Sequence, residues 1–327
     1  METIAVERTT WRGLPAWRLS ATTLELVVSE VGAHIASITR RGETLNPLWV
    51  PPWPAADPAT AGPGQAWGDG PEATLLAGIC GHNLCIDRFG GPWPGEDRPV
   101  HGEAGVRRWS LAPPARAAVE LRVELPQARL AVSRRFRFDG DTAHVDTGVT
   151  HRGDGARDIE WAEHPTIGDP FLDGAVVTAG VDRAWNWPLA ADPATRFRGA
   201  AAGAPLPIAA ALSVPARGDA PCGDVLTSRV TDGWWAAENR ALGRRLTYRW
   251  DARRFPWLAI WTEHRGRTGA PWNGRTRTRG MEFSTKPFPE GKPAAERASA
   301  WQGRPTTCTV PAGRRLKTTW SMRWERL

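Results

Sequence analysis

Polar side chains that are costly to bury gather in four short segments, each bracketed by glycine or proline. These segments span residues 81–91, 101–105, 161–171 and 279–288, and they supply histidine, arginine and glutamate. Histidine titrates near neutral pH, and burial in a dry pocket raises the pKa of a glutamate toward that range. Loops held by a rigid sheet often carry binding and catalytic residues, so these segments are the first candidates for a site that moves protons.

Short β-type runs recur along the whole chain and must position those segments. Several runs alternate apolar and polar residues, which is the period of a half-buried strand. No window shows a long 3.6-residue periodicity, while 34 glycines and 29 prolines supply frequent turns. The sequence therefore predicts an all-β protein built of antiparallel sheets. The clearest runs are residues 24–29, 34–39, 119–125, 143–150, 246–250 and 316–324.

Two long loop-like segments interrupt the strand pattern, at residues 51–71 and 190–221. Both are rich in proline, alanine and glycine, as a linker between domains would be. Strands of the same character continue on both sides of each, so we predict one domain over residues 1–327. We expect the first segment to fold over the mouth of the site.

The order of four motifs resembles the aldose 1-epimerase (galactose mutarotase-like) family. Gly32-Ala33 precedes the strand-like run Ile-Ala-Ser-Ile, an arginine is followed by His101-Gly, His164 precedes an aromatic-containing loop, and Glu282 lies in Gly-x-Glu-x4-Pro. The resemblance extends over nearly the whole chain in the correct order. It implies the fold of that family, a large antiparallel β-sandwich (galactose mutarotase-like supersandwich).

The resemblance also implies roles for individual residues. Glu282 matches the general base, His164 the general acid, and His101 a residue that assists at the ring oxygen of the sugar. Arg88 matches the substrate-binding arginine. The sequence departs from the family at residues 165–171, where epimerases usually show an aromatic residue and an asparagine.

Further substrate contacts are expected near these motifs. The second sugar-binding carboxylate of the family matches Asp224 by order along the chain, or Glu263 by its polar neighbours. Asp87 stands where the family usually has asparagine, and we expect it and His82 to contact the substrate. Trp261 is one of 19 tryptophans, and a rigid aromatic side chain suits the apolar face of a sugar ring.

The reaction that the resemblance implies is the interconversion of the α and β anomers of a hexose or modified hexose. It requires one base at the C1 hydroxyl and one acid at the ring oxygen, and no metal, nucleotide or redox cofactor. A non-catalytic carbohydrate-binding protein is the alternative, which would keep Arg88 without needing both His164 and Glu282. A polysaccharide lyase or glycoside-processing relative is another, and it would need a longer cleft.

Structural roles compete with the catalytic ones. His101 and His164 could be buried histidines satisfied by backbone groups, and Glu282 could be an ion-pair partner of Arg88 or Arg279.

A zinc site is a second competing interpretation. Cys80, His82, Cys85 and His101 form a C-x-H-x2-C pattern followed by a distant histidine, which zinc could accept. The spacing matches no familiar zinc motif, and buried cysteines commonly act as small apolar residues. We therefore expect no metal.

The composition narrows the class of partner. Lysine and arginine number 42 against 35 aspartates and glutamates, which gives a net charge of +7 and a pI near 10. The arginines are scattered rather than gathered on one stripe, so we expect a small sugar as partner and no nucleic acid. The densest run, residues 265–279, is either a solvated surface or a pocket rim for a phosphate, sulfate or carboxylate.

Cellular location and assembly are expectations only. The first ten residues lack an apolar h-region, and no stretch approaches the ~20 apolar residues of a membrane helix. Four cysteines without regular spacing favour a reducing compartment. We expect a cytoplasmic monomer or homodimer without a membrane partner.

Overall fold

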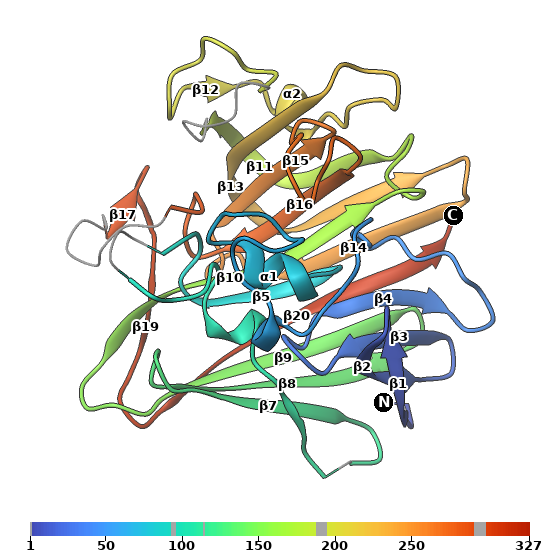
Figure 1. Ribbon diagram of the computed structural model, residues 1–327, viewed down its shortest axis with the longest axis vertical. Helices are drawn as coiled ribbons and strands as arrows, with labels where there is room; N and C mark the ends of the chain where they lie inside the picture. Colours follow the sequence, from blue (N-terminus) through green and yellow to red (C-terminus); the bar gives the residue numbers. More distant parts are fainter. Residues whose placement is uncertain (1, 93–95, 114, 188–194, 291–298) are drawn as a thin grey trace.

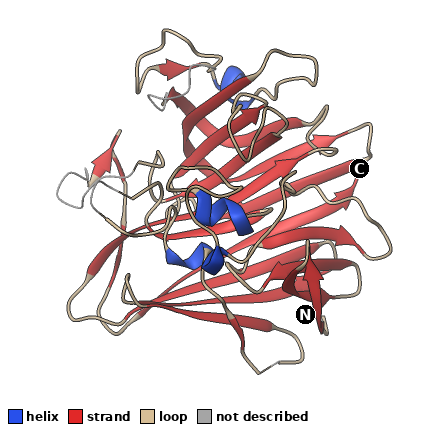
Figure 2. Ribbon diagram, viewed as in Figure 1, coloured by secondary structure: helices blue, strands red, loops and turns tan. Residues whose placement is uncertain are grey.

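A computed structural model describes residues 2–92, 96–113, 115–187, 195–290 and 299–327 (Figure 1). Strands dominate these residues, and helices are few and short (Figure 2). Eighteen of the described strands join in one sheet, which confirms the prediction of an all-β, antiparallel protein. None of the helices that the structure describes is long and apolar enough to span a membrane.

The sheet divides into two arms at one long strand, β13 (Cys222–Asn239). The first half of β13 pairs with β15, the second half pairs with β14, and β11 runs along its other side. Glycine at position 233 lies between the two halves, where a Cβ atom would come within 2.0 Å of the carbonyl oxygen of Trp250. A single strand therefore belongs to both layers of the sandwich.

The first arm carries the segments that the sequence singled out. Its strands alternate between a face turned to the other arm and an outer face, because successive side chains of a strand point to opposite sides. From its edge to β13, the arm consists of β1 (Ala5–Trp11), β2 (Leu14–Ser20), β3 (Leu24–Ser29), β4 (Ile35–Arg40), β5 (His82–Asp87), β10 (Arg157–Gly168), β16 (Arg277–Ser284) and β15 (Trp257–His264).

The second arm packs against the inner face of the first. From its edge to β13, it consists of β6 (Ser110–Leu111), β7 (Val119–Leu125), β8 (Leu130–Asp139), β9 (Thr142–His151), β20 (Arg315–Arg326) and β14 (Arg244–Trp250). The remaining elements are β11 (Val176–Asn186), β12 (Pro205–Leu206), β17 (Ala300–Trp301), β18 (Arg304–Pro305), β19 (Cys308–Val310), α1 (Ala73–Gly78), α2 (Ile208–Leu212), η1 (Pro58–Thr60) and η2 (Glu103–Gly105).

Aromatic side chains fill the space between the arms. Phe283 of β16 stacks on Trp250 of β14 with ring centroids 4.6 Å apart, and Tyr248 stacks on Trp235 at 4.7 Å. All four rings are buried. Aromatic pairs in such stacked contacts add roughly 0.5–1.5 kcal/mol beyond the area that they bury. This packing gives β10 and β16 a rigid support for the residues on their outer face.

The two long loop segments leave the sheet in different places. Strands on both sides of residues 51–71 and 190–221 belong to the same sheet. The first segment leads into α1, which lies in front of β5 and β10 (Figure 1) and covers the outer face of the first arm. Within the second, residues 195–221 include β12 and α2, while residues 190–194 lie outside the described part of the chain.

Candidate active site

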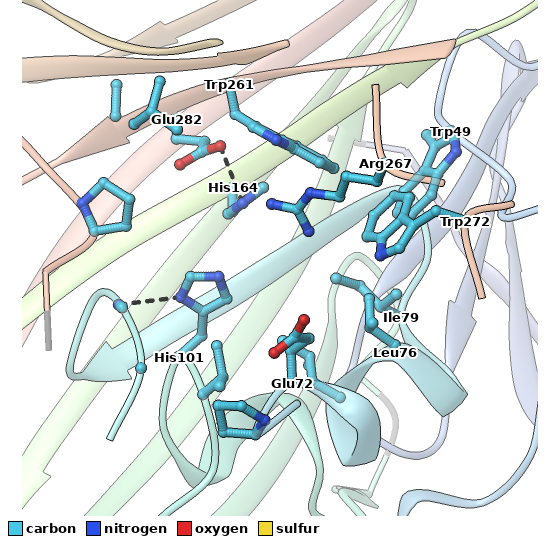
Figure 3. A pocket seen from close by; sticks show the side chains of 18 of the residues that line it. Trp49, Glu72, Leu76, Ile79, His101, His164, Trp261, Arg267, Trp272 and Glu282 are labelled. Atoms are coloured by element: carbon cyan, nitrogen blue, oxygen red, sulfur yellow. Dashed lines mark hydrogen bonds and ion pairs between the residues drawn. The ribbon is translucent and has the colours of Figure 1, made fainter. Parts of the chain in front are cut away.

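A cavity of about 260 Å³ lies on the outer face of the first arm, beneath the excursion that contains α1. His164, Glu282 and His101 line one end, Trp49 and Trp272 line the other, and Trp261 lies between them (Figure 3). Ligand pockets for drug-sized molecules usually enclose ~300–1,000 Å³, so this cavity suits a smaller molecule.

His164 and Glu282 lie opposite each other on neighbouring strands. The register of β10 and β16 pairs Glu163 with Phe283 and Thr166 with Gly280, which brings His164 level with Glu282. The Nε2 atom of His164 is 3.0 Å from Oε1 of Glu282, and both side chains are almost fully buried. Nδ1 of His164 lies 3.1 Å from the hydroxyl of Thr166, which fixes the ring orientation. An imidazole and a carboxylate thus meet at one end of the cavity.

Small residues around Glu282 create the space that its carboxylate occupies. A Cβ atom on Gly280 would lie 2.3 Å from Oε1 of Glu282, closer than carbon and oxygen can approach. On β15, Ala259 pairs with Glu282, and its short side chain also lines the cavity. The glycine of the Gly-x-Glu motif is therefore required sterically, because the Glu282 side chain passes over the Gly280 position of its own strand to reach His164.

His101 reaches the cavity from a loop with unusual backbone geometry. His101 and Gly102 both have positive φ angles, 63° and 84°, and a Cβ on Gly102 would lie 2.1 Å from the carbonyl oxygen of Ile86. The amide of Gly90 donates a hydrogen bond to Nδ1 of His101 at 3.2 Å, and this accepting nitrogen carries no proton. Non-glycine residues with positive φ are uncommon and cluster at functional sites.

The environment keeps the His101 ring neutral. Burial, together with the nearby His164 at a ring-centroid distance of 5.4 Å, lowers the pKa of His101 to about 3. A neutral imidazole that accepts at Nδ1 must carry its proton on Nε2. The second ring nitrogen is turned away from Gly90 and toward the cavity (Figure 3). His101 can therefore donate a hydrogen bond to a ligand without holding a charge.

Tryptophans form the far wall of the cavity. Trp49 and Trp272 stack at 5.8 Å with an angle of 2° between their planes, and Trp261 meets Trp272 edge-on at 5.7 Å. Trp53 supports them from behind, with its ring 4.8 Å from Trp272 and its Nε1 donating to the carbonyl of Leu76 at 2.8 Å. Trp53 lies within residues 51–71 and Leu76 lies in α1, so this hydrogen bond ties the loop segment to the helix beside the tryptophan wall.

Arg267 enters the cavity between the two ends (Figure 3). Its guanidinium carbon lies 4.8 Å from the ring centroid of Trp272 and 5.6 Å from that of Trp261. Glu263 holds the loop, because its Oε1 accepts the backbone N–H of Gly266 at 2.7 Å and of Arg267 at 3.1 Å. The sequence offered Asp224 or Glu263 as the second sugar-binding carboxylate. Glu263 lies beside the cavity, behind Arg267.

Two predicted substrate contacts, Arg88 and Asp87, do not line the cavity. Arg88 is buried and binds both carboxylate oxygens of Glu96, at 2.6 and 2.7 Å. Asp87 is paired with Arg98 at 3.1 Å and Arg157 at 2.5 Å. Both side chains are engaged in ion pairs within the protein, so the cavity lining does not support the expectation that they contact the substrate.

His82 and Asp224 are also placed away from the cavity. His82 points between the arms, where its Nε2 lies 3.0 Å from Glu163 and its Nδ1 lies 3.3 Å from the hydroxyl of Tyr248. Alternation along β5 turns it to the inner face. Asp224 accepts hydrogen bonds from Arg196, 2.6 Å from the guanidinium Nε. The cavity lining therefore does not support the sugar contacts expected of these two residues.

Among the described residues, neither the zinc site nor an ion pair between Glu282 and Arg279 finds matching geometry, whereas His101 does accept a backbone hydrogen bond, from Gly90. The described residues contain no group of three or more histidines, cysteines, aspartates or glutamates that could hold a metal ion. Cys80 packs with Ala16 and Val27, whereas Cys85 packs in a separate apolar cluster, so the suggested zinc ligands are not assembled. Arg279 donates to the backbone carbonyls of Ser213 and Ala211 rather than pairing with Glu282.

Four charged or aromatic residues of the cavity were not identified as site residues from the sequence: Trp49, Glu72, Arg267 and Trp272. The sequence did mark residues 265–279 as a possible pocket rim, but only the structure shows that Arg267 is the arginine of that run which lines the cavity. Trp49 and Glu72 carry no local motif, and they reach the site through the path of the excursion.

Known structures share this fold at low sequence identity. A Klebsiella pneumoniae protein provisionally named aldose 1-epimerase is 15% identical, with a TM-score of 0.68 over 99% of this chain and 84% of that one. A galactose mutarotase-like protein from Clostridium acetobutylicum is 11% identical, with a TM-score of 0.65 over 99% of each chain. A Salmonella typhimurium protein provisionally named mutarotase (YeaD) is 14% identical, with a TM-score of 0.64 over 98% and 94%.

A scan against protein-family models and a search of curated proteins gave no match. At these identities the structural likeness establishes the fold, which is the mutarotase-like β-sandwich expected from the sequence.

Proposed function

We propose that this chain, built on the galactose mutarotase-like fold, interconverts the α and β anomers of a single sugar ring by general acid and base catalysis. The observation that carries the proposal is the meeting of His164 and Glu282, 3.0 Å apart, in a small cavity that His101 also lines. Three residues from distant parts of the chain converge there on the end opposite the tryptophan wall.

Ring opening uses both partners of this pair. Glu282 accepts the proton of the C1 hydroxyl while His164 donates a proton to the ring oxygen, and the bond between C1 and the ring oxygen breaks. The products are the open-chain aldehyde, a protonated Glu282 and a neutral His164. Rotation about the C1–C2 bond then presents the other face of the aldehyde to the hydroxyl that closes the ring.

Ring closure reverses the two proton transfers. His164 takes the proton of the attacking hydroxyl, and Glu282 returns its proton to the aldehyde oxygen, which becomes the new C1 hydroxyl. Both groups end in their starting states, so no co-reactant is consumed. His101 supports the ring oxygen as a neutral hydrogen-bond donor, since its Nδ1 is occupied by the Gly90 amide.

The size of the cavity favours this function over the processing of a polysaccharide. About 260 Å³ accommodates a small ring, whereas a lyase or a glycosidase that acts on chains needs a cleft for several sugars. A non-catalytic binding protein would have no need for an acid and a base in contact, and the substitutions below distinguish it from an enzyme.

The test is the rate of anomer exchange, measured by NMR exchange spectroscopy with a panel of aldoses. Glu282→Gln keeps the shape of the side chain but cannot accept a proton, and His164→Asn cannot donate one. Each should lower the exchange rate by ~10²–10⁴ while sugar binding changes little.

Matched controls are Glu124→Gln on β7 and His144→Asn on β9, which remove the same groups from the second arm. They should exchange anomers like the wild type. A folded Glu282→Gln protein with wild-type activity would assign this carboxylate a structural role and favour the binding-protein alternative.

A further inference from the structure

Arg267 is the one permanently positive side chain among the described residues that line the cavity. It follows β15 on the loop that connects to β16, and its side chain is 34% exposed. Arg88, the arginine that the sequence offered for substrate binding, is buried and held by both oxygens of Glu96. The cavity therefore receives its positive charge from a different part of the chain.

Neighbouring groups fix the guanidinium of Arg267 in one orientation. Glu263 is 1% exposed; its Oε2 lies 3.6 Å from Nε of Arg267, and its Oε1 holds the backbone of the same loop. The rings of Trp272 and Trp261 lie 4.8 and 5.6 Å from the guanidinium carbon. A planar cation beside aromatic rings, with one nitrogen turned to a carboxylate, loses little further freedom when it binds a ligand.

The two Nη atoms are the part of this side chain available to a ligand. Within the described residues, Arg267 makes no side-chain hydrogen bond through them, and the guanidinium points into the cavity between His164 and Trp272 (Figure 3). A guanidinium edge presents two parallel donors, a spacing that matches two neighbouring oxygen atoms. Adjacent hydroxyls on a sugar ring offer such a pair.

We infer that Arg267 orients the sugar in the cavity by donating hydrogen bonds to adjacent ring hydroxyls, and that Glu263 positions it for this task. This inference rests on the proposed function, since it assigns the residue that presents C1 and the ring oxygen to Glu282 and His164. The tryptophan wall receives the apolar face of the same ring.

The charges around the cavity select a neutral sugar rather than a sugar phosphate. Two carboxylates, Glu72 and Glu282, line the cavity against one guanidinium, and Glu263 adds a third carboxylate directly behind Arg267. His101 contributes no positive charge, because burial lowers its pKa to about 3. Even with His164 protonated as the proposed acid, a phosphate dianion would meet more negative than positive charge here, whereas hydroxyls need only the donors that Arg267 supplies.

The first experiment compares Arg267→Gln, Arg267→Lys and Arg275→Gln. Arg275 is exposed, lies on the same loop and does not line the cavity, so its variant makes the same charge change outside the site. Anomer exchange measured against sugar concentration separates KM from kcat, and saturation-transfer NMR measures binding directly. Arg267→Gln should raise KM by about 10–100-fold, because the sugar loses its hydrogen bonds to a charged donor, and kcat should change less.

Arg267→Lys should recover only part of this loss, because an ammonium lacks the two parallel donors. Arg275→Gln should behave like the wild type. If Arg267→Gln matches Arg275→Gln while Glu282→Gln is inactive, the inference about Arg267 is overturned and the proposed function stands.

The second experiment tests the positioning role of Glu263. Glu263→Gln should raise KM in the wild-type background and have little further effect in the Arg267→Gln background, because its influence passes through Arg267. Equal effects in both backgrounds would show that Glu263 serves only the stability of the loop.

The third experiment compares D-glucose and D-galactose with their 6-phosphates. The neutral sugars should have the higher kcat/KM for the wild type. A preference for the 6-phosphates that Arg267→Gln removes would overturn the neutral-sugar assignment. If the wild type binds neutral sugars through Arg267 but accelerates the anomer exchange of none, the proposed function fails and the inference about Arg267 stands. If the wild type shows no exchange and no sugar binding, both the proposed function and the inference are overturned.

Discussion

At the scale of single residues, the position of Glu282, the proposed base, depends on the absence of a side chain at Gly280. Gly280 lies two positions before Glu282 on the same face of β16, and a Cβ there would lie 2.3 Å from Oε1 of Glu282 and 3.3 Å from Cε1 of His164. The carboxylate is the far end of a flexible side chain, so it can move aside where a backbone atom could not. The glycine thus controls the position of the base more than the stability of the strand.

Gly280→Ala should therefore lower the exchange rate on the order of 10²-fold, since displacing a catalytic group by about 1 Å has effects of that size. Its thermal unfolding temperature should change little. Gly218→Ala is the control, because a Cβ at that exposed position meets nothing within 4 Å. Wild-type activity in Gly280→Ala would mean that Glu282 can act from a displaced position, contrary to the geometry described above.

The sequence motifs led to four residues that the fold brings to one cavity, and their roles stay predictions, but the contacts of the arginines could not be predicted. His101, His164, Glu282 and Trp261 all line the cavity, as the motifs suggested. Arg88 lies in a convincing motif, yet Glu96, eight residues further along a loop, occupies its guanidinium. Which acid an arginine finds depends on the fold of loops, and loop paths leave no periodic signal in a sequence.

At the scale of elements, the excursion formed by residues 51–71 and α1 contributes to the cavity wall, while the tryptophan that anchors it lies outside the cavity. Trp53 joins the excursion to the site, because its ring packs on Trp272 and its Nε1 donates to the carbonyl of Leu76 in α1. It is 4% exposed and does not line the cavity. Helix α1 has only six residues, so tertiary contacts of this kind must supply its stability.

Trp53→Ala should loosen the excursion without unfolding the sandwich. Truncating a buried tryptophan costs about 3–5 kcal/mol, and here the loss falls on the contacts that hold α1. Hydrogen exchange measured by mass spectrometry should show faster exchange over residues 72–79, with β10 and β16 unchanged as the internal control. Uniformly faster exchange over the whole sheet would show instead that the excursion is integral to the stability of both arms.

Strands were predictable as elements, but their partners were not. The alternating runs at residues 119–125 and 246–250 became β7 and β14 with the same bounds at one or both ends. The alternation does not reveal that β13 is shared by two arms, because pairing depends on contacts between distant segments. Nor could it show that His82 faces inward and His164 outward, which follows from the register.

At the scale of the whole molecule, histidines buried in a neutral state link stability to pH. Burial lowers the pKa of both His34 and His101 to about 3. In the unfolded chain each would titrate near 6.5, so between pH 6.5 and 3 the unfolded chain binds protons that the folded chain does not. The free energy of unfolding must therefore decrease as the pH falls through this range.

The expected loss is about 2 kcal/mol per histidine between pH 7 and pH 5. Chemical denaturation at a series of pH values measures it directly. His34→Asn should have a lower free energy of unfolding at every pH. That free energy should also depend less steeply on pH, because the unfolded variant binds one proton fewer than the unfolded wild type. A variant with the pH dependence of the wild type would show that His34 titrates alike in the folded and unfolded chain.

The position of β20 between β9 and β14 has a consequence for synthesis on the ribosome. Both neighbours precede β20 along the chain, so they leave the ribosome first and must wait for the strand that joins them. Until β20 emerges, the second arm exposes two unpaired edges with full rows of backbone donors and acceptors, and such edges template aggregation. The nascent chain thus needs shielding by a chaperone or rapid translation of the intervening residues, and slowed elongation between β14 and β20 favours insoluble product.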